Sequence, residues 1–91
     1  MSAEALEHAV YDLGTNRERR ALFRDDIAGF LRLYALTAEE ADLLCRFDVR
    51  AIQAAGVNAM ACMGFWVTTA PDRSLSSYIA ALRGQETSTH G

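Results

Sequence analysis

The sequence predicts an all-α fold, a small orthogonal array of about six or seven short helices. Apolar residues recur at helical spacing along most of the chain, and no segment alternates apolar and polar residues as a half-buried strand does. Residues that start or stop helices separate the apolar runs. With 91 residues, 51% of them hydrophobic, the chain is expected to form one small globular domain over residues 1–84. The polar segment 85–91 is expected to be a flexible tail.

The first two helices are predicted from their end signals. Ser2 is expected to cap a helix that runs through Leu13, with Gly14 as its stop. Thr15 and Glu18 have the Thr-x-x-Glu spacing of a capping box, in which the hydroxyl and the carboxylate satisfy backbone N–H groups of the first turn. This spacing predicts that a second helix begins at Thr15.

The third and fourth helices begin at acidic or hydroxyl residues. Asp25 or Asp26 is expected to start the third helix, and Thr37 with Glu40 forms a second capping-box spacing for the fourth. The residues expected on their inward sides are Ile27, Phe30, Leu31 and Tyr34 in the third helix, and Leu43, Leu44 and Phe47 in the fourth.

The remaining helices are predicted from the same kinds of start and stop residues. Asp48 is expected to cap a helix that Gly56 ends, with Val49 and Ile52 on its buried side. Asn58 is expected to cap the next helix, and Pro71 marks its end at the latest. A final helix is predicted to open at Ser74 or Ser76, to bear Leu75, Tyr78, Ile79 and Leu82, and to close at Gly84.

One series of these residues recurs in a known enzyme family. It consists of Asn16, Arg17, Glu18, Arg19, Phe23, Asp26, Phe30, Leu31, Tyr34, Leu36, Thr37, Glu40, Asp48, Gly56, Val57 and Asn58, followed by a short glycine-ended helix over 78–84. In their order and spacing, these residues resemble the small (alpha, LigA-type) subunit of protocatechuate 4,5-dioxygenase-like extradiol ring-cleavage dioxygenases. Longer members carry an N-terminal arm and a longer segment before the last helix that have no counterpart in these 91 residues, so substrate contacts from those segments do not carry over.

The resemblance implies a function for the chain. It would be the non-catalytic small subunit of a two-component dioxygenase, docked on a larger catalytic subunit. That subunit holds Fe(II) through two histidines and one carboxylate. The small subunit helps to close the active site over a catechol- or aminophenol-type aromatic substrate. The resemblance therefore implies no cofactor and no catalytic residue on this chain, with Fe(II) in the partner.

Two histidines and two cysteines are the candidates for metal or nucleophilic chemistry. His8 lies midway along the first predicted helix and His90 lies in the tail. Neither lies in a cluster with further histidines or cysteines of the kind that a metal site shows, so neither is expected to bind a metal. Cys45 and Cys62 each lie in an apolar helical pattern, and we expect free, buried thiols with raised pKa values, a disulfide being the alternative.

Charged residues offer little further chemistry. The acidic pairs 25–26 and 39–40 fall at helix starts, where the helix dipole favours negative charge, so they need no catalytic role. A cluster of arginines is interpreted as a solvated helix face or, alternatively, as a site for an anion or a partner carboxylate. Its members are Arg17, Arg19, Arg20 and Arg24.

Several function classes are not expected. The formal charge is −3 with no basic stripe, which argues against nucleic-acid binding, and no glycine-rich phosphate loop is present. The longest apolar run, 59–70, is shorter than the roughly 20 residues that a transmembrane helix needs. The first ten residues lack the pattern of a signal peptide, so we expect a cytoplasmic protein without a membrane partner.

The segment 59–70 is apolar around its whole helical circumference. Such a helix is either the centre of the domain's own core or is covered on one side by another chain. Met, Phe and Trp are enriched at interface cores, and the family resemblance favours the second interpretation. The predicted subunit interface or active-site lid consists of Asn58, Met60, Met63, Phe65, Trp66, Val67 and Pro71.

Two alternative functions remain open at this point. The helical domain also resembles the recognition part of split-borosin-type peptide precursors, which an N-methyltransferase binds while it methylates the precursor's tail. The tail QETSTHG is compatible with this, although it is more polar than such tails. The third alternative is a homodimeric scaffold, in which a second copy covers the apolar helix.

Overall fold

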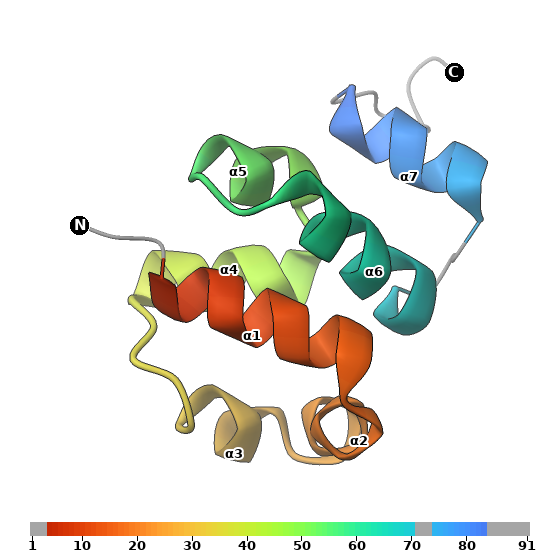
Figure 1. Cartoon of the computed structure of the whole chain (residues 1–91). Coiled ribbons are helices and arrows are strands. Elements are labelled where there is room, and N and C mark those ends of the chain that lie inside the picture. The colour runs from red at the N-terminus through yellow and green to blue at the C-terminus, as the bar shows by residue number, and fades with distance from the viewer. Residues whose placement is uncertain (1–3, 71–73, 84–91) are drawn as a thin grey trace.

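The computed structural model describes residues 4–70 and 74–83, and this part of the chain consists of helices joined by short turns (Figure 1). The all-α prediction is confirmed. Predictions made for Ser2, Pro71, Gly84, His90 and the tail 85–91 lie outside the described residues. The helices of the described part are α1 (Glu4–Thr15), α2 (Arg17–Asp25), α3 (Ile27–Leu31), α4 (Ala38–Arg46), α5 (Val49–Ala54), α6 (Ala59–Thr69) and α7 (Leu75–Leu82).

Helices α1 and α6 form the centre of the fold and make the most extensive contact between any two helices (Figure 1). Helices α2 and α3 pack on each other below α1, and α4 lies behind it. Helices α5 and α7 both contact α6. The segment that is apolar on every side is thus surrounded by helices from both halves of the chain.

Most predicted helix starts are confirmed by their capping bonds. At α4, the Glu40 backbone N–H donates to Thr37 Oγ1 at 3.0 Å, and the Thr37 N–H donates to Glu40 Oε1 at 2.9 Å, which completes the capping box. The side chains of Asp26, Asp48, Asn58 and Ser74 accept from first-turn N–H groups of α3, α5, α6 and α7. Gly56 adopts φ +110°, as its predicted role in ending α5 requires.

The boundary between α1 and α2 was predicted wrongly. Helix α1 continues through Thr15, whose hydroxyl donates to the Tyr11 carbonyl at 2.9 Å. Asn16 caps α2 instead, its Oδ1 accepting from the Arg19 backbone N–H at 3.1 Å. Asn16 is as good a capping residue as threonine, so the local pattern did not exclude it.

Gly14 is not a helix stop, because its role is to permit a close approach between α1 and α6. A Cβ atom at Gly14 would lie 3.1 Å from the carbonyl carbon of Gly64 and 3.2 Å from the backbone nitrogen of Phe65. Both are backbone atoms, which cannot rotate away. Glycine at this position therefore lets the two central helices pack backbone to backbone.

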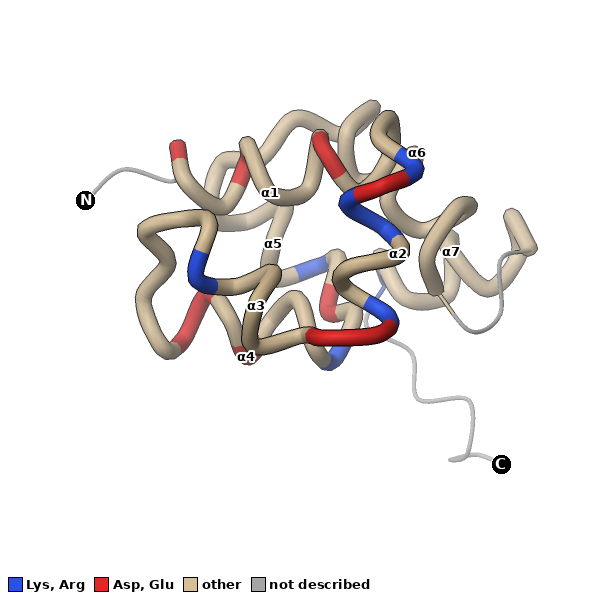
Figure 2. Tube along the Cα trace, turned by 90° about the horizontal axis from the view of Figure 1, so that it is seen from below, with Lys and Arg blue, Asp and Glu red and all other residues tan. Residues whose placement is uncertain are grey.

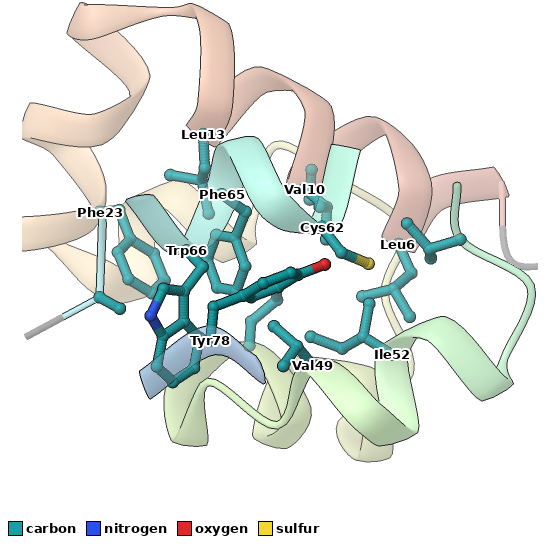
Figure 3. Close-up of a cluster of buried hydrophobic side chains, with 14 of the residues drawn as sticks. Leu6, Val10, Leu13, Phe23, Val49, Ile52, Cys62, Phe65, Trp66 and Tyr78 are labelled. Carbon is teal, nitrogen blue, oxygen red and sulfur yellow. The ribbon is translucent and has the colours of Figure 1, made fainter. Parts of the chain in front are cut away.

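The core is built from α1, α5 and α6 with contributions from the other helices (Figure 3). Phe65 is fully buried and stacks on Phe47 with ring centroids 5.3 Å apart and an interplanar angle of 15°. Phe47 caps α4 in the left-handed conformation, with φ 56°. The fully buried large side chains are Leu6, Val10, Leu13, Phe30, Leu44, Val49, Ile52, Cys62 and Phe65.

Three of the apolar residues that recur at helical spacing in α3 and α7 are exposed. Ile27 is exposed because α3 has only five residues and its buried side is supplied by Phe30. Leu75 and Ile79 are exposed because α7 turns Tyr78 toward the core instead. Tyr34 lies beyond the end of α3, in the turn that leads to α4, and is half-buried there.

Candidate functional site

A groove of about 580 Å³ runs between α1 and α6. Three small residues, Gly14, Ala61 and Gly64, line it where the two helices approach most closely. Two large apolar side chains border it, Tyr11 with 57% and Met60 with 71% of its surface exposed. Exposed side chains of this size beside a hollow are typical of interaction sites.

One end of the groove is acidic. Glu4 and Glu7 line it at the first turn of α1, where negative charge also stabilises the helix. Among the described residues that line the groove, none is a lysine or an arginine. The groove therefore combines an apolar middle with a negatively charged end, and a basic residue on a partner would complement that end.

His8 lines the groove and has a polar network behind it. Its Nε2 lies 3.4 Å from Oδ2 of Asp12, and the same carboxylate oxygen accepts from the Tyr34 hydroxyl at 2.5 Å. The imidazole and the Tyr34 ring meet edge to face, with centroids 5.3 Å apart. Burial and the bond to Asp12 raise the pKa of the Tyr34 hydroxyl, which therefore stays protonated and donates. This network ties the turn after α3 to α1.

Only some of the residues predicted to form the interface line the groove. Asn58 and Met60 line the groove, and Val67 is exposed on α6 without lining it. Phe65 and Trp66 lie in the chain's own core, where Trp66 Nε1 donates to Ser77 Oγ at 3.0 Å. Met63 packs half-buried against that core, and Pro71 lies outside the described residues. The core side chains support the groove from behind rather than line it.

The α1 side of the groove was missed by sequence reasoning. The groove is lined from α1 by Tyr11, Glu7 and His8. These residues lie about 50 residues before α6 in the chain, so no local sequence pattern connects them with it. A signal was present in the two glycines of the apolar segments, Gly14 and Gly64, because small residues are what two closely packed helices need.

The two cysteines are free, and only one is buried. Cys62 lies in the core, and burial, with a smaller contribution from Glu7, raises its pKa to about 11. Cys45 is exposed on α4, which corrects the prediction that both are buried. Its position next to the fully buried Leu44 explains the difference, because neighbouring helical residues point 100° apart.

The buried thiol makes stability dependent on alkaline pH. The chain has nine arginines and no lysine. Cysteine and tyrosine therefore dominate side-chain titration between about pH 9 and 11. The unfolded thiol ionises first, so the stability it contributes is complete below about pH 8.5 and is lost as the pH approaches 11. We expect the free energy of unfolding to fall by at most about 1.4 kcal/mol per pH unit from this group.

Urea unfolding of the wild type and of Cys62→Ala at several pH values checks this expectation. The variant should lose part of the alkaline slope, whereas Cys45→Ala, which removes an exposed thiol, should change the slope less. Equal slopes for the wild type and Cys62→Ala would contradict the assignment.

Within residues 4–70 and 74–83, no group of three or more His, Cys, Asp or Glu side chains is placed to hold a metal ion. Over the same residues, none of the helices has the length and apolar character needed to cross a membrane. Comparison of the chain with protein-family models, curated proteins and solved structures found no match.

Proposed function

We propose that this chain is a non-catalytic docking subunit of an extradiol ring-cleavage dioxygenase. It binds a larger, Fe(II)-bearing subunit through the α1–α6 groove and helps to close that subunit's active site over a catechol- or aminophenol-type aromatic. The groove with its exposed Met60 and Tyr11 is the observation that supports docking. The family resemblance over residues 10–84 supports the identity of the partner.

The groove defines what kind of segment docks in it. Gly14, Ala61 and Gly64 leave room for a bulky apolar side chain, and Met60 and Tyr11 flank that side chain. Methionine and tyrosine are among the residues enriched at interface cores. Glu4 and Glu7 favour a lysine or arginine at one end of the partner segment. An amphipathic helix of the larger subunit, with an apolar anchor and a basic end, meets these requirements.

The physical contribution of such a subunit is the exclusion of water. The iron of the larger subunit would supply the oxygen chemistry. A second chain over the mouth of that site removes water, which strengthens electrostatic interactions inside and prevents side reactions. For this role the chain needs a stable fold and a surface that binds the larger subunit. It does not need a titratable side chain that takes part in the reaction.

Purification of the chain from its native cells, with identification of co-purifying proteins and iron analysis, tests the proposal. The expected result is a larger, iron-containing protein in fixed stoichiometry that opens catechol-type rings with O2 and loses activity when this chain is removed. Ring cleavage that is unaffected by removal would overturn the proposal. A co-purifying N-methyltransferase with a methylated tail would favour the split-borosin alternative, and a stable homodimer alone would favour the scaffold.

Substitution of Met60 by aspartate is expected to weaken binding to the larger subunit at least tenfold, about 1.4 kcal/mol or more. The change places a charge at the rim of an apolar, partly acidic groove. Because Met60 is 71% exposed, the melting temperature should barely change.

Leu75→Asp is the matched control, because Leu75 is an exposed apolar residue on α7, with 57% of its surface accessible, and is not among the residues that line the groove. Titration of the larger subunit with each variant should separate the two changes. A similar loss of affinity for both variants would show that the groove is not the docking surface.

A further inference from the structure

A second hollow, of about 320 Å³, lies on the side of the molecule formed by α2, the end of α4 and the end of α6. Its volume is at the lower end of the range of small-molecule sites, about 300–1,000 Å³. None of its described lining residues also lines the α1–α6 groove. The residues that line it are Arg20, Phe23, Arg24, Phe47, Thr68 and Thr69.

The hollow presents two guanidinium groups of one helix. Arg20 and Arg24 are four residues apart on α2, one turn from each other, and the basic positions of this helix are visible in Figure 2. Like charges at this spacing repel each other, and an anion between them would relieve the repulsion. Among the described residues that line the hollow, none is an aspartate or glutamate.

Each of the two guanidinium groups makes a contact within the protein and keeps further N–H donors. Arg20 Nη1 donates to the Leu13 carbonyl at 3.1 Å, which fixes the guanidinium against the end of α1. Arg24 Nε pairs with Asp25 Oδ1 at 3.2 Å, an exposed contact between neighbouring residues and therefore a weak one. A guanidinium carries five N–H donors, so each side chain retains donors for a ligand.

Two aromatic side chains, Phe23 of the same helix and Phe47 at the end of α4, also line the hollow. Phe23 and Phe47 meet edge to face with centroids 6.2 Å apart, and Phe47 is fixed from behind by its stacking on Phe65. The hydroxyl of Thr68 donates to the Gly64 carbonyl at 2.6 Å, so it offers no free proton to an anion. Positive charge and aromatic surface therefore determine what the hollow selects.

We infer that this hollow binds a small organic carboxylate with an apolar body about the size of one ring. The carboxylate accepts hydrogen bonds from Arg20 and Arg24, as planar guanidinium groups match its geometry. The apolar body packs on Phe23 and Phe47, where ring contacts favour an aromatic over an aliphatic body. The inference is independent of the proposed function, because it involves a different surface of the chain.

Benzoate is the probe, titrated into the full chain at low ionic strength and followed by backbone amide chemical shifts. We expect saturable binding with the largest shifts at the residues that line the hollow. Benzyl alcohol, which has the ring without the charge, and acetate, which has the charge without the ring, should each bind at least about tenfold more weakly. Equal affinity of acetate would mean simple ion pairing, of the kind an acidic side chain also provides, and would overturn the inference.

Arg24→Gln should lower the affinity for benzoate about tenfold, because a charge-assisted hydrogen bond is lost. Arg24 is exposed, so the fold should persist, and the melting temperature checks this. The matched control is Arg17→Gln, which removes an exposed arginine of the same helix that does not line the hollow. An equal loss with Arg17→Gln would indicate general surface electrostatics and overturn the inference.

Discussion

Truncation of Phe65 to alanine is expected to destabilise the protein by about 3–5 kcal/mol, the range observed for buried aromatic residues. Phe65 is fully buried and forms the stacked pair with Phe47. Loss of this ring opens a cavity in the centre of the core and removes the support that keeps Phe47 in its left-handed conformation. Since domains are stable by only about 5–15 kcal/mol, we expect most of the stability to disappear.

Urea unfolding followed by circular dichroism gives the change in free energy. Val67→Ala on the same helix is the control, because Val67 is 39% exposed and its truncation should cost about 0.5 kcal/mol or less. A loss below about 1 kcal/mol for Phe65→Ala would contradict the central position assigned to this ring.

Alanine at Gly14 and alanine at Gly64 are expected to have opposite consequences. Both substitutions gain about 1 kcal/mol of helix propensity, so this contribution cancels in the comparison. At Gly14 the new methyl group would lie 3.1 Å from backbone of α6, whereas at Gly64 its nearest neighbour would be the Gly14 Cα at 3.8 Å. The clash should force α1 and α6 apart and make Gly14→Ala less stable than Gly64→Ala by about 1–3 kcal/mol.

Thermal unfolding of the two variants measures this difference directly. For a domain of this size, each 1 kcal/mol corresponds to about 4–8 °C in melting temperature. Equal melting temperatures would mean that the close approach of α1 and α6 contributes little. Because Gly64 lines the groove, the same Gly64→Ala protein is also a probe of partner binding with the fold kept intact.

The helix starts were predictable because capping is a local interaction. Thr37 and Glu40 lie three residues apart, and Asp48, Asn58 and Ser74 each bond N–H groups within the next three residues. The geometry of such a bond depends only on the short segment that contains it. The confirmed all-α class follows from the same local signals.

Burial at single positions was less predictable, because it depends on which helix faces which. Helical spacing placed Phe30, Leu44, Val49 and Ile52 on apolar stripes, and all four are buried. Leu75 lies on the apolar stripe of the last helix in the same way, and it is 57% exposed. An apolar stripe shows that a face will be covered but does not show how much of its width the neighbouring helix reaches.

The groove illustrates the division between sequence and tertiary structure. The sequence by itself determined the all-α class, most of the helix caps and the presence of Asn58 and Met60 at the start of an apolar helix. Only the tertiary structure decided that Gly14 is a packing position, that Phe65 and Trp66 face inward, and that Tyr11 and Glu7 face the same groove as Met60. The physical reason is range: caps act over three or four residues, whereas the groove requires two helices about 50 residues apart to be placed side by side.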